Sequence, residues 1–218
     1  MKTLIISDSH NYHNDIEIPS GIDCIIHAGD STNYHDIYRN EQEFNSFINW
    51  YSKLEIKHKI LIAGNHDASL TQKYNVEKVK ELGIKYLEHG YCEVDNKLFF
   101  GSPYTPTFGD WYFMKSKDTI YKYWEQMEDG IDVLITHGPP FGILDLVDNF
   151  EFKQAGCPSL LNHVRRIKPK FHIFGHIHDN NDCLNHGIMI REDITFINAS
   201  LVEDGKRFLK HKPIIIEI

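Results

Sequence analysis

The chain has 218 residues, of which 23 are Lys or Arg and 31 are Asp or Glu, so its formal net charge is −8. This acidic balance argues against a general polyanion-binding protein, which normally carries a basic excess. A hydrophobic share of 41% and a charged share of 25% are ordinary for a soluble globular protein. The length predicts one full-sized domain over residues 1–218.

Cysteine usage and the N-terminal sequence predict a cytoplasmic location without membrane contact. The four cysteines form no C-x-x-C pair, so we expect reduced thiols rather than a structural zinc site. The apolar run that follows Met1 is too short for a signal peptide or a transmembrane helix.

Short apolar runs recur along the chain and end in polar turns. Runs rich in Ile, Val, Leu and Phe are typical of buried strands. Five of them are predicted at Thr3–Ser7, Cys24–Ala28, Lys59–Ala63, Val133–Thr136 and Phe171–Phe174. Further strand-like runs are Lys97–Gly101, Gly187–Ile190, Thr195–Asn198 and Pro213–Ile218.

Helical periodicity falls between these runs. The predicted helices are Glu41–Lys53, Val76–Leu82, Asp118–Met127 and Ser159–Ile167. The first of them places Phe44, Phe47, Ile48 and Tyr51 on a single face. Alternation of strands and helices, followed by a strand-rich end, predicts an α/β architecture with more than one sheet layer.

Polar side chains gather in the turns that follow the five predicted strands. In α/β sheets, ligands bind beyond the carboxyl ends of the strands. If these ends lie together, the site contains Asp8, His10, Asp30, Asn65, His66, His137, His176 and His178. Each residue taken alone could be an ordinary turn or loop residue, but five coincidences in strand-end turns argue for a site.

This donor set predicts a divalent metal centre. Carboxylate, imidazole and amide oxygen without thiolate suit Mn, Fe, Zn or Co. Two such ions about 3.5–4 Å apart can stabilise both the attacking and the leaving oxygen in phosphoryl transfer. Asp30 is the best candidate for a carboxylate that bridges the two ions.

The turns together resemble the ordered motifs of the calcineurin-like metallophosphoesterase family. The matching segments are Asp8-Ser9-His10, Gly29-Asp30, Gly64-Asn65-His66-Asp67, His137 and Gly175-His176-Ile177-His178. The sequence is most similar to the small metallophosphoesterase-domain-containing subfamily. Segments similar to that subfamily are Ser102-Pro103-Tyr104-Thr105-Pro106, Thr136-His137-Gly138-Pro139-Pro140, Gly156-Cys157 and Ile197-Asn198-Ala199-Ser200.

The resemblance implies a fold, a ligand set and a mechanism. The implied fold has two packed mixed β-sheets flanked by helices. The implied ligands of the first ion are Asp8, His10, Asp30 and His178, with Asp30 shared, and Asn65, His137 and His176 complete the second site. A metal-bridging hydroxide would attack phosphorus in line. His66 would contact the phosphate or protonate the leaving group, and Asp67 would help to orient it.

The sequence departs from the wider family after the second motif. Ser31-Thr32-Asn33 stands where that family often has Asp-Arg-Gly. This departure weakens a Ser/Thr protein phosphatase interpretation and fits the small subfamily. The presence of His176, which some members of that subfamily lack, favours a complete two-metal site.

The pocket residues around the metals are less clearly defined. His13 and the aromatic segment Tyr104–Phe113 could shape a substrate pocket, with Asn65, His66 and His13 as the substrate-binding residues. Aromatic side chains can stack on a nucleobase, although packing in the core or a lid is the favoured explanation for them.

The leading hypothesis is a phosphodiesterase that acts on small substrates such as cyclic nucleotides, with two divalent ions and Mn favoured. A nuclease, a phosphomonoesterase or a non-catalytic scaffold with the same fold remain alternatives. Long nucleic acids are disfavoured by the net charge of −8. The native substrate, the identity of the metals and the oligomeric state stay open.

Overall fold

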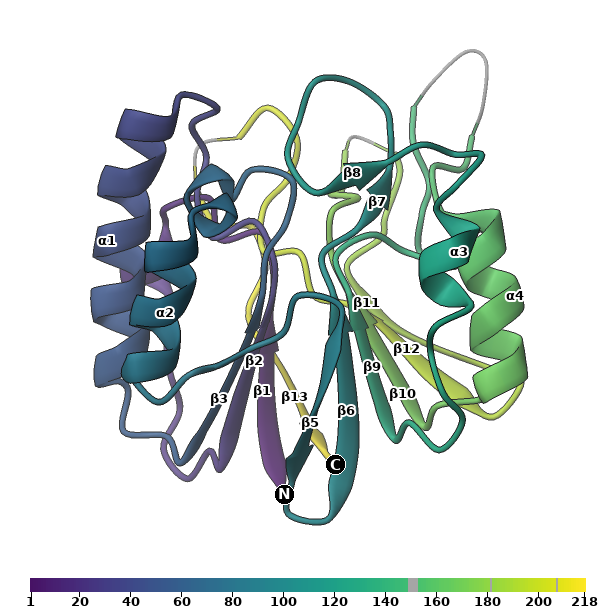
Figure 1. Cartoon of the computed structure of the whole chain (residues 1–218), viewed down its shortest axis with the longest axis horizontal. Helices are drawn as coiled ribbons and strands as arrows, with labels where there is room; N and C mark the ends of the chain where they lie inside the picture. The colour runs from purple at the N-terminus through teal and green to yellow at the C-terminus, as the bar shows by residue number, and fades with distance from the viewer. Residues whose placement is uncertain (149–152, 181, 207) are drawn as a thin grey trace.

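Two β-sheets pack face to face, and helices cover their outer faces (Figure 1). The computed structural model describes residues 1–148, 153–180, 182–206 and 208–218. In spatial order the first sheet consists of β13 (Ile214–Glu217), β1 (Lys2–Ile6), β2 (Cys24–Ala28), β3 (His58–Ile62) and β4 (Lys85–Tyr86). Only β13 runs antiparallel to its neighbour in this sheet.

The second sheet is also mixed. Its order is β11 (Gly187–Arg191), β12 (Ile194–Asn198), β10 (Phe171–Phe174), β9 (Val133–Thr136), β6 (Lys97–Ser102) and β5 (Gly90–Val94). The two outer strands, β11 and β5, are antiparallel to their neighbours, and the central pairs are parallel. A parallel two-stranded ribbon, β7 (Thr105–Pro106) with β8 (Met114–Lys115), lies above the second sheet (Figure 1).

Each sheet has its own pair of helices. α1 (Ile37–Lys53) and α2 (Lys73–Glu81) cover the first sheet, and α3 (Tyr121–Trp124) and α4 (Pro158–Ile167) cover the second (Figure 1). Short 3-10 turns occupy His13–Asp15 and Ala68–Thr71.

The amphipathic pattern of α1 explains its position. Phe44, Phe47 and Tyr51 are fully buried against the first sheet. The Tyr51 hydroxyl donates to the carbonyl oxygens of Ile25 and Ile60, at 3.1 and 2.8 Å, and so ties the helix to β2 and β3.

A separate apolar layer fills the space between the two sheets. Side chains of both inner faces contribute to it, among them Ile5, Ile26, Ile60, Phe99, Val133, Ile135, Ile173 and Ile197. Because this layer locks the sheets together, it also fixes the turns at their carboxyl ends relative to one another.

The predicted α/β fold with two packed mixed sheets flanked by helices is confirmed. The helix predicted at Asp118–Met127 is shorter, because α3 covers only Tyr121–Trp124. Its flanks form turns with hydrogen bonds between residues three apart, as from Met127 N to Trp124 O. The pattern also missed β5, where polar and apolar residues mix on an outer strand of the sheet.

Candidate metal centre

The turns at the carboxyl ends of five strands meet at one edge of the molecule, opposite the two termini (Figure 1). They carry Asp8 and His10 after β1, Asp30 after β2, Asn65 and His66 after β3, His137 after β9, and His176 and His178 after β10. Backbone hydrogen bonds join the turns, including Asp8 N to Gly29 O at 2.9 Å and Gly175 N to His137 O at 3.0 Å. The predicted convergence of strand ends therefore occurs.

Several of these residues have left-handed backbone conformations. The φ angles are 52° at Asp8, 40° at His10, 57° at Asp30 and 69° at His176. Such conformations in residues other than glycine cost about 1–3 kcal/mol each and cluster at functional sites. The surrounding hydrogen bonds must offset this strain. The conformation of these turns is therefore typical of a functional site.

One group of ligand atoms comprises Asp8, His10 and His178, all within 4.8 Å of one another. His178 Nε2 lies 3.2 Å from Asp8 Oδ1 and 3.4 Å from His10 Nε2. The Asp8 carboxylate also accepts from the backbone N–H of His176 at 3.0 Å. Burial alone would raise the pKa of Asp8, but the hydrogen bond and charge of His178 hold it below its ordinary value.

A second group comprises Asp30, His137 and His176. His137 Nε2 lies 3.3 Å from Asp30 Oδ2 and 3.0 Å from Asn65 Oδ1. Burial is the largest single influence on His137 and lowers its pKa. The charge and hydrogen bond of Asp30, the charge of Asp8 and the hydrogen bond to Ala28 O together outweigh burial and raise this pKa to about 9. The raised pKa reports a negative potential at the ring, which any cation placed there would also experience.

Asp30 lies between the two groups. Its Oδ2 is 3.9 Å from His10 Nε2 on one side and 3.3 Å from His137 Nε2 on the other. Its Oδ1 accepts from the backbone N–H of His66 at 2.7 Å, which fixes the plane of the carboxylate.

Four imidazole rings are oriented in the same way. In each of them Nδ1 forms a hydrogen bond with an oxygen atom outside the cluster. These contacts are His10 to Thr32 O at 3.1 Å, His66 to Asn33 O at 2.8 Å, His137 to Ala28 O at 2.9 Å, and His178 to an Asp204 carboxylate oxygen at 2.8 Å. A carbonyl oxygen or carboxylate only accepts, so Nδ1 carries the hydrogen and Nε2 of the neutral ring presents a lone pair.

These lone pairs face other acceptors across short distances. Nε2 of His178 faces both Asp8 and His10, and Nε2 of His137 faces Asp30. Acceptors at such distances are stable together only if a proton or a cation lies between them. The residues therefore fit divalent metal ions, because imidazole Nε2 with a hydrogen-bonded Nδ1 is the usual form of a metal-binding histidine.

The described lining of the cavity at the site contains neither Lys nor Arg. Its residues are Asp30, Asn65, His66, Phe108, Trp111, Val147, His176, Ile177, His178, Asn180 and Asp204. Buried carboxylates are stable only when they are paired or bind metals. The partners of Asp8 and Asp30 in the cluster are the imidazoles of His178 and His137, 3.2 and 3.3 Å away, and divalent ions held by the same imidazoles would neutralise both carboxylates.

Asp67 lies behind the cluster and does not line the cavity. Its buried carboxylate accepts from the backbone N–H groups of Gly64 at 2.7 Å, Asp30 at 2.8 Å and Ser31 at 3.0 Å. It also accepts from the side chains of Ser31 and Thr32. Burial raises the pKa of Asp67, against the effect of these hydrogen bonds. Its position suits a residue that joins the turns after β2 and β3.

The structure does not bring His13 to the cavity. Its ring is buried against Trp50 and Phe47, and Nε2 lies 3.1 Å from Ser46 Oγ. The other predicted site residues lie in the cluster or, for Asp67, directly behind it.

One residue at the site was missed from the sequence. Asp204 orients His178 through the Nδ1 contact and lines the cavity. It stands in the segment Glu203-Asp204-Gly205, which has the composition of an ordinary turn and gives no signal of this contact.

Two packed mixed sheets with a histidine and aspartate cluster at their strand ends define the class of metal-dependent phosphoesterases. The sequence pattern of the calcineurin-like phosphoesterase family matches residues 1–180. The chain therefore belongs to this family.

Sequence relatives extend over almost the whole chain. Metallophosphoesterase domain-containing protein 1 of Homo sapiens is 32% identical over 238 residues, which cover 98% of this chain and 69% of that protein. A UPF0046 protein of Caenorhabditis elegans is 35% identical, with 100% of this chain and 81% of that protein covered.

A solved structure supports the fold. A candidate 5′-nucleotidase from Staphylococcus aureus superposes with a TM-score of 0.55 at 13% identity, covering 90% of this chain and 48% of that one. Separately, none of the helices in the described part of the chain has the length and apolar character needed to span a bilayer.

Proposed function

We propose that the protein hydrolyses phosphate esters at a centre of two divalent metal ions. The observation that carries the proposal is the set of imidazole Nε2 atoms that face Asp8, Asp30 and one another. Family membership supports the phosphoester hydrolase class. The geometry supports two ions, because Asp30 shares one group of candidate ligands with His10 and His66 and another with His137 and His176.

Each ion has a separate set of proposed ligands. The first would be held by Asp8, His10, Asp30 and His178, and the second by Asp30, Asn65, His137 and His176. The donor set contains nitrogen and oxygen but no sulfur, which suits Mn, Fe, Zn or Co, and we favour Mn. When bound, such ions polarise the phosphoryl oxygens and lower the pKa of a water molecule that can act as the nucleophile.

The protein side chains would bind and orient the substrate and move the proton. His66 lines the cavity with its Nδ1 held by Asn33 O, so its Nε2 is free to contact the phosphate or protonate the leaving oxygen. Asn65 lines the same cavity and would contact a phosphoryl oxygen. Asp67 would act through the turns it joins rather than by touching the substrate.

For the substrate we propose small phosphodiesters such as cyclic nucleotides. A cavity of about 170 Å³ and a net charge of −8 both disfavour long nucleic acids as substrates. A phosphomonoesterase would use the same ligands, so the preference between diester and monoester is decided by assay. The complete ligand set argues against the scaffold alternative.

We further propose that residues 1–218 form one catalytic domain in the cytoplasm. The family pattern ends at residue 180, yet Asp204 holds His178, and β11 and β12 complete the second sheet. The four cysteines are unpaired thiols, as expected in a reducing compartment.

The test combines metal counting with a substrate panel. Protein stripped of metal and reloaded with Mn²⁺ is expected to bind two ions per chain by elemental analysis. It should hydrolyse bis(4-nitrophenyl) phosphate faster than 4-nitrophenyl phosphate, and cyclic nucleotides should also be tested. His176→Ala should lose the second ion and most of the activity, whereas His163→Ala on α4 serves as a matched control that loses neither.

The outcomes separate the parts of the proposal. If protein with two confirmed ions hydrolyses none of the esters, the proposed enzymatic function is overturned. A strong preference for the monoester would overturn only the diesterase assignment. One ion per chain would overturn the dinuclear centre.

A further inference from the structure

The mouth of the cavity is bordered by two aromatic rings from one loop. This loop joins β7 to β8 and arches over the edge where the strands of both sheets end (Figure 1). It supplies Phe108 and Trp111, whose rings approach opposite parts of the cluster. Trp111 lies 4.1 Å from His66 and Phe108 lies 5.2 Å from His176, measured between ring centroids.

The two rings differ in how much of their surface is already occupied. Trp111 is packed between His66 and His35, whose ring centroid is 5.3 Å away. Phe108 is 55% exposed, although it lines the cavity. A ligand that covered this exposed phenyl surface would gain free energy from burying it, about 25 cal/mol per Å². Phe108 is therefore more exposed than Trp111, which is half-buried and contacts two imidazoles.

Contacts to the first sheet hold the loop in place. His35 Nε2 donates to the carbonyl oxygen of Asp110 at 2.7 Å, and the Tyr112 hydroxyl donates to His35 O at 3.2 Å. The backbone N–H of Tyr112 also donates to the carbonyl oxygen of Asn65 at 3.2 Å. Since Asn65 is itself a proposed ligand, the loop that carries Phe108 is attached to a turn of the candidate metal centre.

The size of the cavity determines which part of a ligand meets Phe108. Its volume of about 170 Å³ is smaller than the roughly 300–1,000 Å³ of pockets that enclose a whole drug-sized ligand. A phosphoryl group fits at the ligand cluster, but most of an attached organic group must lie at the mouth. There it meets Phe108, with Val147 and Ile177 as further apolar lining.

The polar lining favours the same conclusion. Asp204 contributes a carboxylate, and the described lining has no Lys or Arg that could bind a further anionic group of the ligand. For the organic group the lining therefore offers apolar and aromatic contact, with the Asn180 amide as a further polar group, rather than a positive charge from Lys or Arg.

We propose that Phe108 is a specificity-determining residue whose ring binds a planar aromatic group of the ligand, so that the site selects phosphate esters that carry such a group. This inference rests on the proposed function, because it assumes that the phosphoryl group lies at the metals. Stacking of this kind contributes about 1–3 kcal/mol per ring, so an aromatic ligand should bind about tenfold more tightly than an aliphatic one.

The test uses binding of phosphonates, which are not hydrolysed because their P–C bond is stable. Calorimetry on the Mn²⁺-loaded protein compares phenylphosphonate with methylphosphonate, which share the phosphoryl end. The wild type should bind phenylphosphonate about tenfold more tightly. Phe108→Leu, which keeps an apolar side chain but loses the ring, should reduce this ratio to about threefold or less, whereas Phe108→Tyr should retain it.

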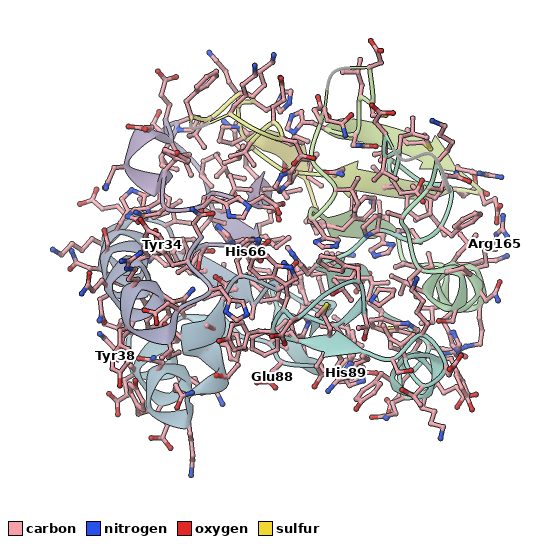
Figure 2. The ribbon with its side chains drawn as sticks, turned by 90° about the horizontal axis from the view of Figure 1, so that it is seen from above. Tyr34, Tyr38, His66, Glu88, His89 and Arg165 are labelled. Carbon is pink, nitrogen blue, oxygen red and sulfur yellow. The ribbon has the colours of Figure 1, made fainter. Side chains whose placement is uncertain are left out.

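The control is an aromatic residue elsewhere on the surface. Tyr38 is 78% exposed and lies on α1 at the outer edge of the molecule, well away from His66 near its centre (Figure 2). Tyr38→Leu should leave both affinities unchanged. Metal content, measured for every variant, should stay at the wild-type value.

Several results would overturn the inference. Equal affinity of the wild type for both phosphonates, absence of binding of both, or an unchanged ratio in Phe108→Leu would each do so. A preference for phenylphosphonate without turnover of any ester would leave the inference standing while overturning the proposed function, so the two failures can be told apart.

Discussion

The two sheets contribute different chemistry to the candidate metal centre. The turns after β1 and β2 in the first sheet supply both carboxylates among the predicted ligands, Asp8 and Asp30. The turns after β9 and β10 in the second sheet supply only imidazoles among the predicted ligands, namely His137, His176 and His178. The complete donor set therefore exists only when the sheets are packed together.

The means of orientation also differ. Each carboxylate is fixed by the backbone of a neighbouring turn: Asp8 accepts from His176 N, and Asp30 accepts from His66 N. Two second-sheet imidazoles, His137 and His178, are each fixed by a single oxygen at Nδ1. The carboxylates should therefore be sensitive to small backbone displacements, whereas an imidazole should respond mildly to the loss of its one partner.

The largest expected loss of activity and metal distinguishes Asp30, which is proposed to bind both ions, from Asp8, which is proposed to bind one. Asp30→Asn should lower activity by about a thousandfold or more, because several kcal/mol of transition-state stabilisation depend on the ions and about 1.4 kcal/mol corresponds to tenfold in rate. Elemental analysis should find neither ion retained, since Asp30 belongs to the proposed ligand set of each ion. Asp8→Asn should lose only the first ion. Equal metal loss in both variants would contradict a bridging role for Asp30.

A smaller loss of activity is expected when a neighbouring side chain displaces the carboxylate of Asp30. A Cβ at Gly64 would overlap Asp30 Oδ1 and lie 2.6 Å from His137 Cε1. Gly64→Ala should lower activity about a hundredfold, because displacements near 1 Å in a catalytic array cost that much. Turnover of an aryl diester and thermal unfolding are the measurements.

Gly90→Ala is the matched control for this substitution. A Cβ at Gly90 meets nothing within 4 Å, and the backbone there is not left-handed. Its activity should remain at the wild-type value. Wild-type activity in Gly64→Ala would show that the turns can move apart, against the rigid coupling described above.

The same distinction explains what could be predicted from the sequence. The strand ends and their donor residues were predictable because each motif follows a buried apolar run, so local pattern and ligand type coincide at Asp8, Asp30 and His137. The fold class followed because alternating strands and helices allow few layer arrangements.

Contacts between distant loops could not be predicted in this way. The contact of Asp204 with His178, the packing of Trp111 on His66 and the burial of His13 all depend on tertiary packing. His13 follows the first motif by three residues, yet the 3-10 turn His13–Asp15 directs its ring towards α1. Proximity in sequence did not imply proximity at the site.

Removing the partner of one imidazole should have a moderate effect. Asp204→Asn keeps the size of the side chain but weakens the contact to His178 Nδ1, which is 2.8 Å long. Loss of such a partner typically lowers metal affinity about 10- to 100-fold. Competition with a chelator should show weaker binding of one ion only, with the second unchanged. Loss of both ions would contradict the independent orientation of the second-sheet imidazoles.

The smallest expected effect concerns a buried histidine in β10, behind the metal ligands of the second sheet. His172 is fully buried, and its Nε2 lies 2.8 Å from Thr136 Oγ1. Burial lowers the pKa of His172 from 6.5 to about 3. Between these values the unfolded chain binds the proton and the folded chain does not, so the contribution of the neutral ring to stability is present above about pH 6.5 and is lost as the pH falls towards 3.

This linkage should appear as a difference between two stability profiles. Between pH 7 and pH 5.5, the free energy of unfolding of the metal-free wild type should fall by about 1.2 kcal/mol more than that of His172→Leu, because the variant lacks the titrating ring. Urea unfolding at both pH values measures this difference, and other titrating groups cancel because both proteins share them. An equal fall in the free energy of unfolding of the two proteins would mean that burial does not hold His172 neutral. The ring would then accept a proton in the folded protein.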